Sequence, residues 1–257
     1  MKLVEHGRGK PLLMIHGLGG STRSWDTVAD ALAAERRLLL FDIPGHGEAP
    51  AEPDSGTFTG LCRSVSELIV DNGLRGVDMI GSSMGARMVL ELARRGLAGN
   101  VVSLDPGGFW VGWERAYLRN TLSASVWLLR SVRPALSGLA HNAVSRSALL
   151  AQLSARPWAL DGDVVARELQ SFASCRTFDA LVEDLAAGPA QQGPSAPGSG
   201  RVTIVWGKQD RLCLPQQAER AKAAFPEAEL VWFDRCGHFP MWDQPEDTVE
   251  LVLRATA

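Results

Sequence analysis

The chain has 257 residues, of which 46% are hydrophobic and 21% charged, and its formal net charge is −3. This length and this apolar content predict one or two domains with a large core. The sequence has no basic stretch that would neutralise phosphates, which argues against nucleic acid as a partner. The longest apolar runs have only a few residues. Because a membrane-spanning helix needs about 20 apolar residues, we expect no membrane partner.

The N-terminus and the cysteines indicate the compartment. The first residues become charged before an apolar segment builds up, which is unlike a secretory signal peptide, so we expect a cytoplasmic protein. The four cysteines lie far apart and form no C-x-x-C pair. This spacing argues against a structural zinc site and against a small fold held by disulfides.

Short apolar runs alternate with helical patterns along the first hundred residues, and each run ends in a glycine or acidic turn. This alternation predicts a mostly parallel sheet with crossover helices. The runs are apolar throughout, as in strands that are covered on both faces. We expect six strands, with a helix that begins near Pro215 between the last two; the strands lie at residues 12–15, 38–41, 77–80, 101–104, 202–206 and 229–233.

The middle of the chain interrupts this rhythm. From about residue 109 to residue 185 the pattern is helical, without a strand-like run. It ends in a stretch at 187–200 that is rich in Gly, Pro, Ser and Gln, which we interpret as a flexible connector. The predicted organisation is an α/β core formed by residues 1–106 and 201–257, with a helical insertion at 107–200.

The run at 77–80 leads directly into Gly81-Ser82-Ser83-Met84-Gly85, and a helical pattern follows. This is a G-x-S-x-G motif in the strand, turn and helix context that it requires. The turn is so tight that its central residue is strained, and small neighbours make this possible. We predict that Ser83 is a nucleophile and that the adjoining helix N-terminus favours a developing negative charge.

A second glycine-rich loop, His16-Gly17-Leu18-Gly19-Gly20, follows the first strand. With this loop and the G-x-S-x-G motif, the chain resembles an α/β-hydrolase-fold protein. The resemblance implies a mostly parallel central sheet flanked by helices, and an inserted helical cap. It also implies that the backbone N–H groups of Leu18 and Met84 form the oxyanion hole. His16 belongs to the loop motif, and we expect a structural role for it.

The resemblance also places a general base and an acid. His238 follows the last strand, in Cys236-Gly237-His238-Phe239-Pro240, and Asp210 follows the preceding strand in a G-x-x-D-x-x-x-P loop. The order Ser83, Asp210, His238 is the nucleophile, acid, base order of this fold. His238 would take the proton of Ser83, and Asp210 would orient the imidazole. Asp105 is an alternative acid, because some family members take the acid from the end of that strand.

Asp42-Ile43-Pro44-Gly45-His46-Gly47-Glu48-Ala49 resembles a structural turn of the family, with Ala49 in place of the usual Ser. His16, Asp42 and His46 lie on separate loops and lack the spacing of metal ligands. We expect neither a metal ion nor a cofactor.

In this fold the insertion covers the site and determines specificity. Its aromatic residues belong either to the core of the cap or to the wall of an apolar pocket. Phe109 and Trp110 follow a strand end that faces the site, and Met241 and Trp242 follow His238. We therefore predict that these four residues line the substrate pocket.

The predicted function is that of a serine hydrolase, a carboxylesterase acting on small to medium apolar esters through an acyl-enzyme. The same triad also serves C–C bond hydrolases, thioesterases and acyltransferases, and the motifs do not separate these reactions. A receptor-like ligand-binding protein with slow or no turnover is the alternative from another class. The oligomeric state stays open.

Overall fold

The computed structural model describes residues 1–257 and contains one seven-stranded sheet in the order β1-β3-β2-β4-β5-β6-β7. The strands from β3 to β7 in this order are parallel, and β1 pairs antiparallel with β3 at one edge. β1 was not predicted; it is three residues long and exposed, so it carries no apolar pattern. The strands are β1 (Val4–His6), β2 (Lys10–Ile15), β3 (Arg36–Leu40), β4 (Val77–Ser82), β5 (Ala98–Leu104), β6 (Val202–Gly207) and β7 (Glu229–Phe233).

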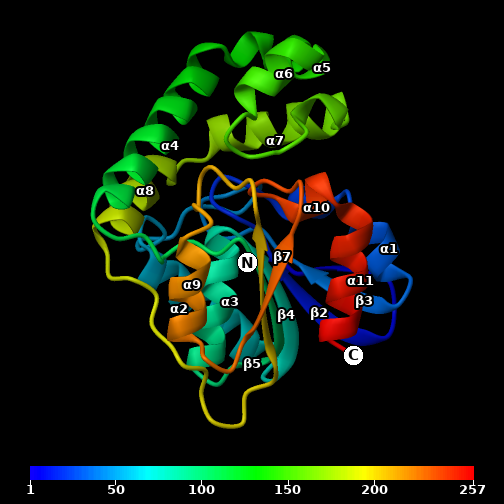
Figure 1. Ribbon diagram of the computed structural model, residues 1–257. Helices are drawn as coiled ribbons and strands as arrows, with labels where there is room; N and C mark the ends of the chain where they lie inside the picture. The colour runs from blue at the N-terminus through cyan, green and yellow to red at the C-terminus, as the bar shows by residue number, and fades with distance from the viewer.

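Helices cover both faces of the sheet (Figure 1). Helices α2, α3 and α9 lie on one face, and α1 and α11 lie on the other. The short helix that connects β7 to α11 is α10. The bounds are η1 (Thr22–Trp25), α1 (Ala29–Ala33), α2 (Phe58–Asp71), α3 (Met84–Arg94), α9 (Gln217–Ala224), α10 (Pro240–Asp243) and α11 (Pro245–Ala255).

The two covered faces explain the uninterrupted apolar runs. Neighbouring residues of one strand alternate between two cores: Leu13 packs in the core under α2, α3 and α9, whereas Leu12 packs in the core under α1 and α11. A period of two along a strand sends successive side chains to opposite faces. The fold class expected from the sequence is therefore correct, and the strands that are covered on both faces are apolar throughout.

The inserted segment forms a layer of helices above the carboxyl ends of the strands (Figure 1). Helices α4 and α8 pack together, and α7 packs against α4 and α5. No helix of the chain is both long enough and apolar enough to span a membrane. The helices of this cap are α4 (Trp113–Ser131), η2 (Arg133–Ala135), α5 (Leu136–His141), α6 (Ala143–Leu149), η3 (Pro157–Ala159), α7 (Gly162–Ser174) and α8 (Phe178–Ala187).

The stretch that returns from the cap forms no helix or strand, but it is bound to the core. Gln191 is buried, its N–H donates to the Gly108 carbonyl, and its side chain accepts a bond from Arg87 of α3. The Ala196 N–H donates to the Ala93 carbonyl. Backbone and glutamine amides thus provide the contacts here, which differs from the flexible connector expected from the low apolar content.

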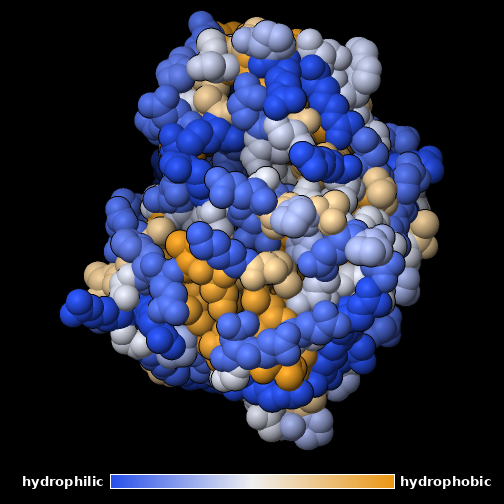
Figure 2. Space-filling model, turned by 180° about the vertical axis from the view of Figure 1, so that it is seen from behind, coloured by the Kyte–Doolittle hydropathy of each residue, from blue (hydrophilic) through white to orange (hydrophobic).

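Apolar side chains are not fully enclosed in the α/β part of the molecule. In the view from behind, hydrophobic residues gather below the cap, whereas the surface of the cap is mostly hydrophilic (Figure 2). Val4 of β1 and Val70 of α2 are exposed hydrophobic residues of the α/β part. The carboxyl edge of the sheet, in contrast, is covered by the cap.

Candidate active site

Ser83 lies between the end of β4 and the start of α3, in a strained conformation with φ +56° and ψ −114°. The two flanking glycines make this turn possible. A Cβ atom on Gly81 would lie 2.2 Å from the Gly85 carbonyl oxygen, and one on Gly85 would lie 2.2 Å from the Ile15 carbonyl oxygen. No larger residue fits at either position, so the motif forces the Ser83 side chain away from the strand.

The structure brings Ser83, His238 and Asp210 into one chain of hydrogen bonds. The Ser83 hydroxyl donates to His238 Nε2 over 2.8 Å, and His238 Nδ1 donates to Asp210 Oδ2 over 2.8 Å. The other carboxylate oxygen of Asp210 accepts the N–H groups of Leu212 and Cys213. Because a carboxylate only accepts, these contacts select the tautomer with a proton on Nδ1 and leave Nε2 free to take the serine proton.

The cap also holds the loop that carries His238, a contact that the sequence did not predict. The His238 N–H donates to the carbonyl of Leu153, which lies in the cap between α6 and η3. The buried Asp243 carboxylate accepts the N–H groups of Gly237 and Ala155. His238 is therefore positioned from both the core and the cap, and no sequence motif marks these contacts.

The glycine-rich loop after β2 lies beside Ser83. A Cβ atom on Gly17 would lie 3.1 Å from the Ser83 Cβ atom, and Leu18 and Met84 both line the cavity next to Ser83. Met84 is the first residue of α3, so the helix offers no acceptor for its N–H. The arrangement therefore suits two N–H donors directed at a developing oxyanion.

His16 has a structural environment. It is fully buried, its Nε2 accepts the Ile43 N–H, and its Nδ1 faces the Gly17 carbonyl at 2.8 Å. Burial lowers the pKa of His16, and burial lowers the pKa of the neighbouring His46 to about 3. Both imidazoles are thus neutral at pH 7. Asp42 accepts the N–H groups of Thr22 and Glu48 and joins their two loops.

Asp105 lies next to Asp210 but makes no hydrogen bond to His238. Its side chain is fully buried, and Oδ1 accepts the Gly207 N–H over 2.8 Å. Burial, and then the charge of Asp210, raise the pKa of the Asp105 carboxyl well above its usual range. Of the two candidate acids, Asp210 is therefore the one in contact with His238.

A cavity of about 160 Å³ adjoins Ser83 and His238, and 18 of its 24 lining residues are hydrophobic. The cap contributes most of this wall. Arg87 of α3 is the one Lys or Arg among the lining residues. The apolar cap residues that line the cavity are Leu118, Leu122, Val126, Leu128, Leu129, Ala148, Leu149, Leu153, Leu169, Phe172, Phe178 and Leu185.

Of the four predicted pocket residues, only Trp110 lines the cavity. The prediction is wrong for Phe109, which packs in the core under α2, α3 and α9. It is also wrong for Met241 and Trp242, because α10 turns into the opposite core directly after Phe239. Phe239 is instead the residue of this loop that lines the cavity, together with His238.

Three tryptophans on the cap helices are neither core nor pocket residues. Their exposed fractions are 65% for Trp113, 69% for Trp127 and 58% for Trp158. Phe172 and Phe178 are the cap aromatics that reach the cavity.

Asp210, Cys213 and His238 present possible metal-ligand atoms within 4.8 Å of one another. Burial and the charge of Asp210 raise the pKa of the Cys213 thiol, so the sulfur keeps its proton at neutral pH and is a poor ligand. Both imidazole nitrogens already face Asp210 and Ser83. The group suits proton transfer better than metal coordination.

A family model for the alpha/beta hydrolase family matches residues 12–251. The chain belongs to the alpha/beta hydrolase family. A curated relative, the dihydrolipoyllysine-residue acetyltransferase component of an acetoin cleaving system from Pseudomonas putida, is 29% identical over 258 residues. That alignment covers 95% of this chain and 63% of the relative, so this chain spans less than two thirds of that protein.

Two further comparisons fit the same family. A 2-hydroxy-6-oxononadienedioate/2-hydroxy-6-oxononatrienedioate hydrolase from Dechloromonas aromatica is 26% identical, with 94% of this chain and 85% of the relative aligned. An esterase from Exiguobacterium antarcticum superposes with a TM-score of 0.76 at 16% identity, covering 99% of this chain and 94% of that chain. At this identity the likeness to the esterase shows the fold alone.

Proposed function

We propose that the protein is a serine hydrolase, a carboxylesterase that cleaves small to medium apolar esters. The observation that carries the proposal is the hydrogen-bond chain Ser83–His238–Asp210 next to an apolar cavity. A serine hydroxyl is a weak nucleophile, and an adjacent base oriented by a carboxylate is the arrangement that activates it.

In the first half of the reaction, Ser83 Oγ attacks the ester carbonyl while His238 Nε2 takes the serine proton. The N–H groups of Leu18 and Met84 bind the oxyanion. The imidazolium then gives its proton to the departing alcohol, which leaves an acyl group on Ser83. Water activated by His238 releases the acid and restores the serine.

The cavity supports an apolar acyl or alcohol group, because 18 of its 24 lining residues are hydrophobic. Binding should improve by up to about fourfold per methylene group until the cavity is full, which corresponds to about 0.8 kcal/mol per buried methylene. Substrates with a charged group at the far end should gain nothing from this wall, apart from the single cation of Arg87.

C–C bond hydrolysis is the second candidate. A relative at 26% identity is named as a hydrolase of a dioate, a substrate class with two carboxylates. Arg87 is the feature of this cavity that favours such a substrate. Its guanidinium forms no ion pair and bonds the Gln191 side chain and the Pro189 carbonyl, although Asp184 and Glu91 act on its charge from a greater distance.

The test is turnover of p-nitrophenyl esters of increasing acyl length by the parent protein, Ser83→Ala and Ser82→Ala. Ser82 is the matched control, because it is the adjacent buried serine and its hydroxyl has no hydrogen-bond partner. We expect Ser83→Ala to lose at least about three orders of magnitude in kcat, and Ser82→Ala to keep most of the activity.

Two other results would change the assignment. Labelling of Ser83 by a fluorophosphonate without ester turnover would retain the nucleophile and favour C–C hydrolysis, thioester cleavage or acyl transfer. Absence of both turnover and labelling would favour a ligand-binding protein that keeps the fold.

A further inference from the structure

A second buried carboxyl group lies behind the proposed acid. Asp105 follows β5 and is one of three non-glycine residues with positive φ, together with Ser83 and Arg235. Its N–H donates to the Val205 carbonyl, and its Oδ1 accepts the Gly207 N–H. Its Oδ2 is buried and accepts no hydrogen bond. One oxygen of this carboxyl group is thus satisfied and the other is not.

The surroundings of Asp105 contain acids and thiols but no ion-pair partner. Asp210 and Cys213 face it from the loop after β6, Cys236 from the loop after β7, and Asp243 from α10. Burial raises the pKa of both thiols, so neither carries a charge at neutral pH. Two adjacent carboxylates in such a site cannot both be ionised, and one of them must hold a proton.

The hydrogen bonds decide which of the two carboxyl groups is ionised. Asp210 already accepts three donors, which are the N–H groups of Leu212 and Cys213 and the imidazole of His238. Asp105 accepts only one, from Gly207. Donors stabilise the charged form of a carboxyl group, so the negative charge belongs on Asp210 and the proton on Asp105.

We propose that Asp105 is a positioning residue, whose protonated Oδ2 donates a hydrogen bond to the Asp210 carboxylate and holds it against His238. The inference rests on the proposed function, because it concerns the same proton relay. The proton stays on Asp105 throughout the reaction, while His238 transfers the proton of Ser83 and later that of the attacking water. Asp210 then has a fourth donor, and the buried pair carries one negative charge.

Two substitutions separate this role from simple packing. Asp105→Asn keeps an N–H donor for Asp210 and an acceptor for Gly207, and asparagine tolerates positive φ. Asp105→Ala removes both groups. We expect Asp105→Asn to keep kcat within about threefold of the parent, and Asp105→Ala to lower kcat about tenfold or more at an unchanged KM, as for loss of a hydrogen bond to a charged group. Thermal unfolding of both variants checks that they are folded at the assay temperature.

The pH profile provides a readout that packing would not change. An ionised Asp105 would stabilise the imidazolium, so its replacement by Asn would move the acidic limb of kcat/KM to lower pH. A protonated Asp105 adds no charge, and we expect the limb of Asp105→Asn to coincide with that of the parent. The infrared difference spectrum between the two proteins should contain the C=O band of a protonated carboxylic acid.

The inference is overturned if Asp105→Asn shifts the acidic limb by about one pH unit or lacks the carboxylic acid band in the difference spectrum. It is also overturned if folded Asp105→Ala has the kcat of the parent. Failure of the proposed function would be distinguishable, because Ser83→Ala would then keep its ester turnover.

Discussion

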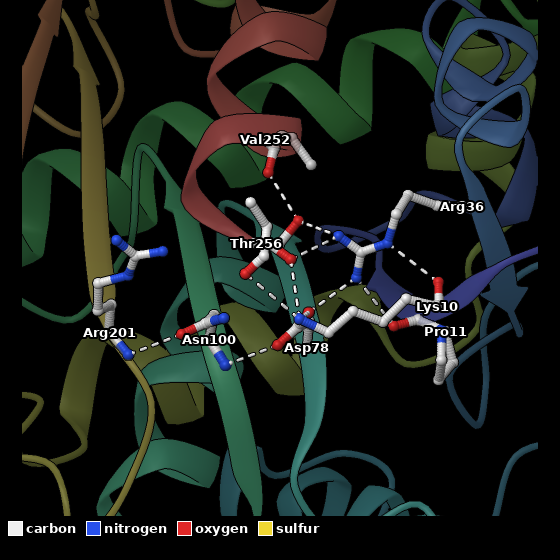
Figure 3. Close-up of polar contacts among 9 residues, drawn as sticks. Lys10, Pro11, Arg36, Asp78, Asn100, Arg201, Val252 and Thr256 are labelled. Atoms are coloured by element: carbon white, nitrogen blue, oxygen red, sulfur yellow. Dashed lines mark hydrogen bonds and ion pairs between the residues drawn. The ribbon is translucent and has the colours of Figure 1, made fainter.

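Buried carboxyl groups lie both at the amino ends of the strands (the amino edge of the sheet) and at their carboxyl ends (the carboxyl edge). The two sets differ in what surrounds their charge. At the amino edge, Asp78 at the start of β4 is 3% exposed on its side chain and faces Arg36 Nη2 at 2.8 Å and Lys10 Nζ at 3.0 Å (Figure 3). At the carboxyl edge, Asp105 and Asp210 have neither a lysine nor an arginine as an ion-pair partner. Hydrogen-bond donors and a titratable imidazole surround them instead.

Under the proposed function, this difference separates a structural charge from a reactive one. A carboxylate fixed between cations keeps its charge, so the Asp78 cluster can join the first residues of β2 and β3 to Thr256 at the end of α11 (Figure 3). A carboxylate without a cation responds to the proton position of its neighbours. Substitutions at the amino edge should therefore alter stability, and those at the carboxyl edge should alter activity.

The largest expected effect is at the carboxyl edge. Asp210→Asn should lower kcat by about 10⁴-fold, because an amide can donate to His238 and so favours the wrong tautomer. The unfolding temperature should change little. Ester turnover and thermal unfolding measure the two effects. A loss of less than tenfold would mean that Asp105 supplies the carboxylate when Asp210 is removed.

At the amino edge, Arg36→Met should destabilise the protein by about 3–5 kcal/mol, since it leaves the buried Asp78 without its main partner. The value of kcat/KM at 25 °C should stay that of the parent. Arg37→Met is the matched control, because Arg37 is partly exposed and lies 3.8 Å from Glu5; its loss should cost less than about 1 kcal/mol. Denaturant unfolding of the three proteins tests this contrast, and equal losses for both variants would refute it.

Glu168 is a further buried carboxyl group, and it lies at the contact between the cap and the core. It is buried on α7 and accepts the Ser24 hydroxyl at 3.0 Å, and burial raises its pKa from 4.5 to about 7. The folded state thus binds this proton more tightly than the unfolded state, so stability falls as pH rises from 4.5 through 7. The expected loss is about 3 kcal/mol by pH 8.

Glu168→Gln should remove this dependence. The variant should be more stable than the parent at pH 8, and the difference should vanish near pH 4.5. Denaturant unfolding at several pH values measures it. Parallel stability curves for the two proteins would show that Glu168 is ionised in the folded state without cost.

The smallest expected effect concerns the second cation at Asp78. The Lys10 side chain is 52% exposed, so water and salt screen its charge. Lys10→Met should cost less than about 1 kcal/mol, and the difference from the parent should shrink further at 1 M salt. If Lys10→Met destabilised the protein as much as Arg36→Met, solvent exposure would not determine how much each cation contributes to stability.

The sequence predicted six of the seven strands, and it marked the residues that the structure joins in the Ser83–His238–Asp210 hydrogen-bond chain, because both depend on local constraints. A strand covered on both faces must be apolar throughout, and a tight turn needs glycines at 81 and 85. Boundaries were less accurate. The helix expected near Pro215 begins at Gln217, because the proline belongs to the preceding turn.

The pocket could not be predicted in the same way. Phe109, Met241 and Trp242 are close in sequence to site residues, but adjacent residues point to opposite sides of a chain that turns. The cavity wall comes from cap helices whose apolar faces look alike in sequence, whether they face the cavity or another helix. Exposed tryptophans at 113, 127 and 158 follow no sequence pattern that separates them from Phe172.

The sequence by itself therefore determined six of the seven strands, the order of the motifs and the identity of each candidate reactive group. These follow from short-range sterics and from a period of two along each strand. Only the tertiary structure decided that Asp210 rather than Asp105 contacts His238, and that the cap holds the loop of the base. Such choices depend on how separate strand ends and the cap meet in space, which no local pattern encodes.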